Sequence, residues 1–145
     1  MNTPSAQAFT DPTLKQAHNW LREKKPMEAK RHLLALQTRY HDKHPFAGRY
    51  QLILARASEM LGEMQAGEEH SKLAIKIGRG HDPLIEAEGL ELLGKVVYRQ
   101  GQSEIGARQF ERAIAKYHSA LNQVEQRHLP EATTLAYEGL ARTYT

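Results

Sequence analysis

Two histidine-containing segments are the strongest candidates in this sequence for metal binding or catalysis. In His41-Asp42-Lys43-His44 the histidines are three residues apart, and imidazole nitrogens bind zinc well when they share one helical face. However, Pro45 pushes the residue before it out of helical geometry, and no second pair of histidines or carboxylates has a matching spacing. The segment is therefore predicted to be a solvated turn between helices, without a metal.

His81-Asp82 is the second segment, because a histidine oriented by a carboxylate can act as a general base. Adjacent side chains seldom point at each other, and no nucleophile motif accompanies this pair. Asp82 precedes Pro83, which is the pattern of a helix N-cap followed by the first helical residue. The glycines in residues 78–80 lack the spacing of a phosphate-binding loop. These features predict no enzyme activity, no cofactor and no metal.

The composition is that of one soluble helical domain. The chain has 145 residues, of which we expect 1–10 to be a flexible N-terminus and 11–145 a single domain. It has no cysteine, which excludes disulfides and thiolate metal sites. The formal charge of +3 is spread along the chain, which disfavours nucleic acid as a partner. There is no signal-like segment or long apolar run, so we expect a cytoplasmic protein with no membrane partner.

Apolar residues recur at spacings of three and four residues almost everywhere, which predicts an all-α protein. Asp11 is expected to cap the first helix, and Trp20 to lie in the core. Pro26 opens a second helix that carries apolar residues as far as Tyr40. The other five helices are expected at about 46–61, 63–77, 83–100, 102–124 and 131–145.

Small residues recur at a fixed interval along these helices. Gly101 follows Gly62 by 39 residues, and Ala113 follows Ala74 by the same number. The same shift pairs Leu93 with Leu54, Gly94 with Ala55, Gly106 with Gly67 and Phe110 with Ser71. A shift of 38 pairs Ala17 with Ala55, Ala29 with Gly67 and Leu36 with Ala74. Such a period indicates stacked helical hairpins whose helices approach closely at the small residues.

The pattern resembles the tetratricopeptide repeat (TPR) family, and residues 87–117 carry the resemblance most clearly. There Leu93-Gly94, Gly101, Gly106 and Phe110 stand where that family places Leu-Gly, Gly, a small residue and an aromatic. The period is longer than the family's usual length of about 34 residues, which resembles the extended repeats of bacterial regulatory proteins. The resemblance implies a right-handed α-solenoid of stacked antiparallel hairpins, with about three repeats and a C-terminal closing helix.

In this family the first helix of each hairpin lines a concave groove that binds peptides or helices. Carried over to this chain, the groove positions are His18, Arg22, Arg49, Leu52, Arg56, Lys95, Tyr98, Arg99 and Arg142. Tyr98 stands beside Val97, so the sequence leaves its side chain open to either the groove or the core. Four glutamates, Glu59, Glu88, Glu91 and Glu138, dilute the positive charge, but the centre of the groove is expected to be basic.

These expectations predict a protein-interaction module, or adaptor, that binds an acidic or amphipathic peptide of another protein. One alternative is a self-associating scaffold: a homodimer, or part of a longer array, formed through an open face with Leu135, Leu140 and Tyr144. A further alternative is nucleic-acid binding through the same basic groove, which predicts affinity that falls steeply with salt. The intermixed glutamates argue against nucleic acid.

Overall fold

The computed structural model describes residues 11–126 and 130–144, and these form seven α-helices without strands. The helices are α2 (Pro12–Arg22), α3 (Pro26–Leu34), α4 (Ala47–Met60), α5 (Met64–Gly78), α6 (Pro83–Arg99), α7 (Ser103–Gln126) and α8 (Pro130–Tyr144). The all-α prediction is confirmed for this part of the chain. The N-terminus that we expected to be flexible, residues 1–10, lies outside the described residues.

The predicted second helix is wrong at its C-terminal end. We expected it to reach Tyr40, but α3 ends at Leu34 and a series of turns follows. Tertiary contacts explain the difference: the Tyr40 hydroxyl donates hydrogen bonds to both carboxylate oxygens of Asp11, at 3.1 and 2.9 Å. Its ring also stacks on Tyr50, with 4.9 Å between centroids. Burial of Tyr40 therefore outweighs the helical pattern of its segment.

Two aspartates cap helices as predicted. The Asp11 carboxylate accepts hydrogen bonds from the amides of Thr13 and Leu14, at 3.0 and 3.2 Å, and so satisfies the start of α2. Asp82 accepts one from the amide of Ile85 at 3.3 Å at the start of α6. The capping role accounts for the aspartate of the His81-Asp82 segment.

The three hairpin turns share one backbone conformation. Lys24, Gly62 and Gly101 are left-handed, with φ of 62°, 78° and 88°, and they follow one another at the sequence intervals of 38 and 39. In each turn the next residue's amide bonds back to the carbonyl five residues earlier. These pairs are Lys25 to Trp20 at 2.7 Å, Glu63 to Ser58 at 2.8 Å and Gln102 to Val97 at 3.0 Å. All three helices thus end in the same Schellman turn.

The small residues of the period lie where paired helices touch, as the sequence predicted. A Cβ added to Gly106 of α7 would stand 2.9 Å from the carbonyl oxygen of Gly94 in α6. One added to Gly67 of α5 would stand 3.7 Å from the carbonyl oxygen of Ala55 in α4. The ring of Phe110 lies against Gly94, so the aromatic and the glycine form one packing unit.

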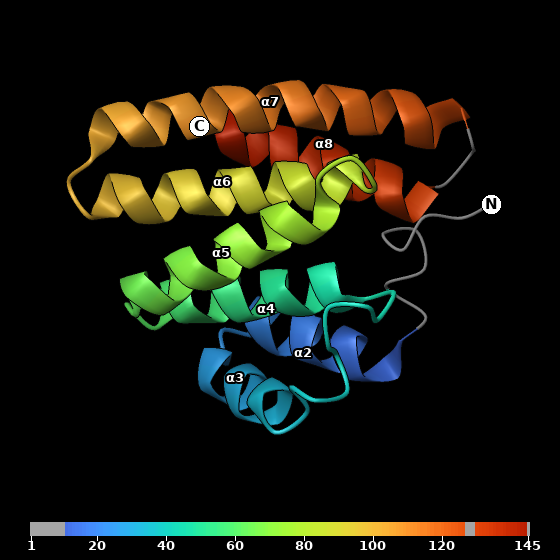
Figure 1. The fold of residues 1–145 in the computed structure, drawn as a ribbon, viewed down its shortest axis with the longest axis vertical. Coiled ribbons are helices and arrows are strands. Elements are labelled where there is room, and N and C mark those ends of the chain that lie inside the picture. Colours follow the sequence, from blue (N-terminus) through green and yellow to red (C-terminus); the bar gives the residue numbers. More distant parts are fainter. Residues whose placement is uncertain (1–10, 127–129, 145) are drawn as a thin grey trace.

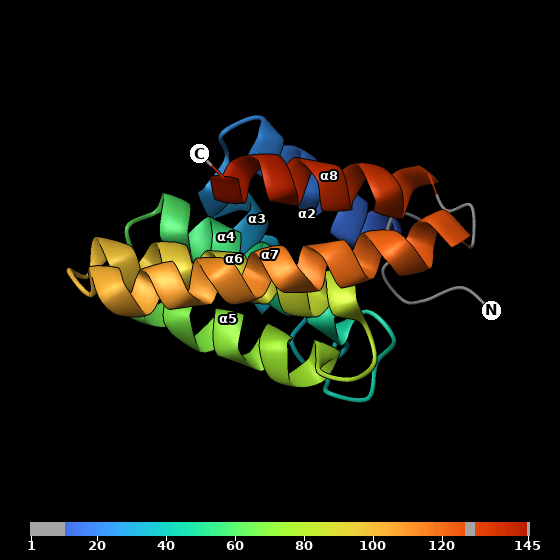
Figure 2. The same cartoon turned by 90° about the horizontal axis from the view of Figure 1, so that it is seen from above.

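The hairpins follow one another through the molecule. Figure 1 shows α2 and α3 at the bottom, α4 and α5 in the middle, and α6 and α7 at the top. Along this series α2 contacts α4, α4 contacts α6 and α6 contacts α8. In Figure 2 α8 lies on the side of α6 and α7 opposite α5. None of the described helices combines the length and the apolar character that crossing a membrane requires.

Candidate functional site

The first helices of the three hairpins and α8 surround a pocket of about 490 Å³, which we call the central pocket. Its polar lining consists of His18, Arg22, Lys24, Arg56, Glu59, Glu88, Glu91, Lys95, Glu138 and Arg142. Its apolar lining consists of Leu21, Met60, Leu92 and Leu135. The volume is in the range of ligand-binding clefts. Helices far apart in sequence are therefore brought together by the hairpin order to build one site.

Five of the predicted groove residues line this pocket, namely His18, Arg22, Arg56, Lys95 and Arg142. They come from α2, α4, α6 and α8, so the structure brings together the first-helix positions that the sequence selected. Their role in binding a partner stays a prediction. The four glutamates that the sequence placed among them, Glu59, Glu88, Glu91 and Glu138, also line the pocket.

Arg49 does not line the pocket, contrary to the prediction. Its side chain is 8% exposed, and Nη2 binds the Glu88 carboxylate at 2.6 Å. Burial opposes the charge of Arg49, but Glu88 and Asp82 more than compensate and raise its pKa. Arg49 therefore holds α4 against α6 from within and presents no charge to a ligand in the pocket.

Tyr98 and Arg99 also lie outside the pocket lining. The Tyr98 side chain is 55% exposed, and its ring centroid is 6.5 Å from that of Phe110. Tyr98 therefore lies on the side of α6 that faces α7, which answers the question that the sequence left open. Arg99 donates to the Glu59 carboxylate at 2.5 Å and to the Glu59 carbonyl at 3.3 Å. Arg99 therefore pairs with Glu59, which lines the pocket, but does not line the pocket itself.

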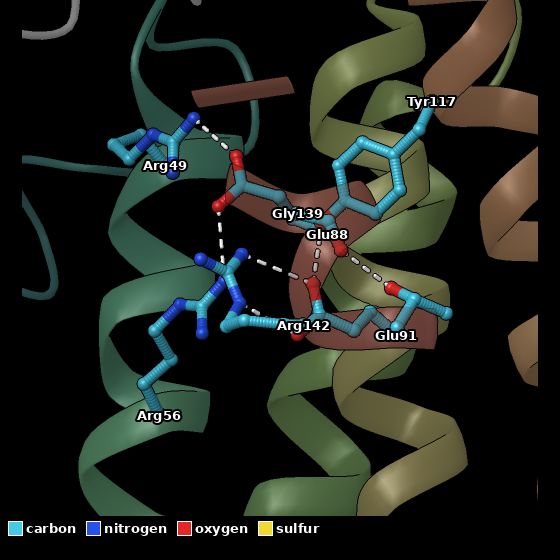
Figure 3. A network of polar contacts seen from close by, with 8 residues as sticks. Arg49, Arg56, Glu88, Glu91, Tyr117, Gly139 and Arg142 are labelled. Atoms are coloured by element: carbon cyan, nitrogen blue, oxygen red, sulfur yellow. Dashed lines mark hydrogen bonds and ion pairs between the residues drawn. The ribbon is translucent and has the colours of Figure 1, made fainter. Parts of the chain in front are cut away.

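Figure 3 shows the ion pairs that form the floor of the pocket, in which Glu88 and Glu91 bind arginines. Glu88 is at their centre. One carboxylate oxygen accepts from Arg49 at 2.6 Å, and the other accepts from Arg56 at 3.0 Å. Burial alone would raise the pKa of Glu88, but the two guanidinium groups lower it to about 2. Glu88 is consequently ionised at neutral pH and links α6 to two positions on α4.

Glu91 makes a similar link, from α6 to α7 and α8. It accepts a hydrogen bond from the Tyr117 hydroxyl and a two-pronged ion pair from Arg142, at 2.8 and 3.1 Å. Burial, together with the charges of Glu88 and Glu91, raises the pKa of Tyr117, which keeps the phenol protonated as a donor. The pKa of Arg142 is also raised, because bonding to Glu91 outweighs its burial. Glu91 therefore fixes α8 over the pocket.

His18 lies in the pocket wall on α2 as a neutral imidazole. Burial and the nearby positive charge of Arg49 lower its pKa to about 4, although the charge of Glu88 acts in the opposite direction. A neutral imidazole can still donate or accept a hydrogen bond. At neutral pH, His18 therefore contributes hydrogen bonding and no charge to the pocket.

Positive charge remains in excess after the ion pairs are counted. Five cations line the pocket, namely Arg22, Lys24, Arg56, Lys95 and Arg142. Four carboxylates line it, so the formal excess is one positive charge. The central pocket is therefore slightly basic, and most of its charges are held in ion pairs.

The predicted self-association residues do not form one open face. Leu135 and Leu140 are each 8% exposed and belong to the core cluster that includes Tyr117 and Ala120. They pack inward because α8 lies on α7 and α6. Of the three, Tyr144 alone is well exposed, at 67%.

His41 and His44, the candidate metal ligands of the sequence, accept hydrogen bonds from backbone amides. His41 and His44 lie with their ring centroids 6.4 Å apart. The Nδ1 atom of His41 accepts from the amide of Lys43 at 3.2 Å, and that of His44 from Phe46 at 3.0 Å. Among the described residues, no group of three or more histidine or carboxylate side chains is arranged to hold a metal ion.

Sequence reasoning missed the importance of two side chains. Tyr117 is not among the predicted site residues, although its hydroxyl donates a hydrogen bond to Glu91. A buried tyrosine needs a partner for its hydroxyl, and that rule was the available signal. Lys24 is also not among the predicted site residues, yet it lines the pocket. Its signal was the glycine at the corresponding position of the next two hairpins.

Comparison with known proteins adds no relative to this description. No family model matches the chain, and neither a curated protein nor a solved structure does. The resemblance to tetratricopeptide repeats therefore depends on the residues and packing described above.

Proposed function

We propose that the three hairpins and α8 form a right-handed α-solenoid of the TPR kind, with the central pocket on its concave side. Three observations support this architecture: the common turn at Lys24, Gly62 and Gly101, the small residues at the helix contacts, and the row of contacts from α2 to α8. Stacked hairpins of this kind present their first helices to a bound chain.

The proposed function is protein interaction: the central pocket holds an acidic or amphipathic segment of a partner protein. The observation that carries this proposal is the formal excess of one positive charge in a pocket lined by the first helices of the three hairpins and by α8. An acidic segment supplies the missing negative charge, and arginine pairs with carboxylates through parallel hydrogen bonds. The charges would set the orientation and the association rate of the partner.

Apolar side chains at the pocket would supply the rest of the affinity. Met60 is 37% exposed at the pocket edge, whereas Leu21, Leu92 and Leu135 present small areas on its walls. Burying one large apolar side chain of a ligand contributes about 1.5–3 kcal/mol. A partner with leucines on one face and carboxylates on the other would match both kinds of lining.

The test uses three labelled peptides that differ only in charge. The acidic probe carries Glu and Leu at helical spacing, and Lys or Gln replaces Glu in the basic and neutral probes. Fluorescence anisotropy should show tightest binding of the acidic probe. The double variant Arg22→Glu/Lys95→Glu, with helicity checked by circular dichroism, should weaken that binding by about tenfold or more, which corresponds to about 1.4 kcal/mol.

A matched control separates the pocket from the overall charge. Lys15→Glu/Arg108→Glu changes the net charge equally at exposed residues outside the pocket, and should leave the affinity within about twofold. Equal losses in the two double variants would contradict binding in the pocket. Equal binding of all three probes would contradict an acidic partner. Tighter binding of an unrelated DNA strand than of the acidic probe would favour the nucleic-acid alternative.

Self-association remains a second candidate, with a different surface from the one predicted. On α8 the side chains of Tyr137 and Tyr144 are 53% and 67% exposed. Tyr137 also borders a shallow groove between α7 and α8 that contains Leu121 and Leu140. Mass measured by light scattering across a concentration series should rise toward a dimer in the wild type and stay monomeric in Tyr137→Glu. A monomeric mass at every concentration would contradict this candidate.

A further inference from the structure

The turn between α2 and α3 differs from the two equivalent turns in the residue at its left-handed position. Gly62 and Gly101 occupy that position in the later hairpins, and glycine adopts positive φ without steric cost. Lys24 occupies it in the first hairpin with φ of 62°. A side chain with a Cβ is disfavoured in this conformation, so Lys24 is the strained member of the set.

The side chain of this strained residue, Lys24, lies at the central pocket. Lys24 and Arg22 both line the central pocket, and both are exposed to solvent. The other lining cations are differently placed: Arg56 binds Glu88 at 3.0 Å, Lys95 binds Glu59 at 3.3 Å, and Arg142 is paired with Glu91. Within the described residues, Lys24 and Arg22 make no ion pair.

The α2 edge of the pocket therefore holds the cations that are available for a ligand. The pairs of the floor are already neutralised within the protein, and an incoming carboxylate would have to break them. Arg22 and Lys24 would gain a partner without losing one. Backbone strain that persists beside a binding cleft often marks a functional side chain.

We propose that Lys24 and Arg22 form the anion-recognition edge of the central pocket, which binds a carboxylate side chain of an acidic partner peptide. The inference rests on the proposed function and assigns the end of the pocket at which the acidic residue docks. It also explains why a lysine stands where the repeat uses glycine.

The inference predicts that stability and binding change in opposite directions when Lys24 is replaced by glycine. Lys24→Gly removes the strain and should raise the melting temperature by about 2–4 °C. The same change should weaken binding of the acidic Glu/Leu probe by about fivefold, because one charged contact is lost. A purely structural lysine would give the first effect without the second.

Three further variants complete the test. Lys24→Arg keeps the charge and should bind the acidic probe within about twofold of the wild type, whereas Arg22→Gln should weaken it about as much as Lys24→Gly. Lys25→Gly is the control: its exposed lysine has a φ of −119° and is absent from the pocket lining. It should leave binding unchanged and lower the melting temperature.

The outcomes separate this inference from the proposed function. If the wild type prefers the acidic probe, and Lys24→Gly is more stable but binds it equally well, the edge is wrong and the pocket proposal survives. If the wild type shows no preference for the acidic probe, both proposals fall. A loss of binding in Lys25→Gly equal to that in Lys24→Gly would also overturn the edge.

Discussion

Gly139 of α8 lies directly against the phenol ring of Tyr117 in α7: a Cβ added to the glycine would stand 2.1 Å from the Tyr117 Cζ atom. The Tyr117 hydroxyl donates a hydrogen bond to Glu91, and Glu91 also forms an ion pair with Arg142 of α8. The close contact between Gly139 and the Tyr117 ring therefore helps to set the position of α8, and with it one wall of the central pocket.

Gly139→Ala should destabilise the protein by about 1–3 kcal/mol, because the added methyl group overpacks the contact with Tyr117. In an unobstructed helix the same change would stabilise by about 1 kcal/mol, so the sign is diagnostic. Urea unfolding measures it. In a Tyr117→Ala background the obstruction is gone and Gly139→Ala should become stabilising; a cost that persists there would contradict the contact.

Glu88→Gln should cost about 3–5 kcal/mol, since it leaves the guanidinium groups of Arg49 and Arg56 beside a neutral amide in a buried site. The matched control is Glu68→Gln, which breaks the exposed pair with Lys72 and should cost less than about 1 kcal/mol. Chemical denaturation of both variants gives the comparison. Equal small losses would show that the buried network contributes little.

Stability should fall in two stages as the solution is acidified. The folded-state pKa of His18 is lowered from 6.5 to about 4, so the unfolded chain binds the extra proton first and stability declines between those values. The folded-state pKa of Glu88 is lowered from 4.5 to about 2, so its contribution is present above 4.5 and is lost toward pH 2. Melting temperatures measured across this range should show both stages.

Two variants assign these stages to their residues. His18→Gln should reduce the decline below pH 6.5 and leave the more acidic stage in place. Glu88→Gln should do the opposite. A smaller decline should remain below pH 6.5 in His18→Gln, because burial also lowers the pKa of His70. An unchanged upper stage in His18→Gln would show that another group titrates there.

Gly62→Ala should destabilise by about 1–2 kcal/mol through the backbone alone. No atom lies within 4 Å of the added Cβ, so the φ of 78° is the whole cause. Gly62→Asn should cost less, because asparagine tolerates this conformation. Thermal unfolding of the two variants gives the comparison. A Gly62→Ala variant as stable as the wild type would contradict the left-handed turn at this position.

The periodic features were predictable from the sequence, because each depends on a local rule. Glycine at residues 62 and 101 marks a left-handed turn, and Gly94 with Gly106 marks a close helix contact. The early end of α3 was not predictable in this way, since it follows from the bond between Tyr40 and Asp11, 29 residues apart. Local pattern carries no information about such distant partners.

The candidate site shows the same division. First-helix spacing selected Arg56 and Lys95, and both line the same pocket. It failed for Arg49, because its burial depends on Glu88, a residue 39 positions away on another helix. It also failed for Leu135 and Leu140, whose burial depends on how α8 packs on α7. Helical periodicity identifies a face, whereas the neighbour that covers the face is decided by tertiary packing.

The central claim is that an acidic segment binds in the central pocket. The most direct measurement is an NMR map of backbone amide shifts in isotope-labelled protein during titration with the acidic Glu/Leu probe. The largest shifts should fall on the pocket-lining parts of α2, α4, α6 and α8 and on the turn at Lys24. Saturating shifts confined to the outer helices α3, α5 and α7, or no shifts at all, would contradict the claim.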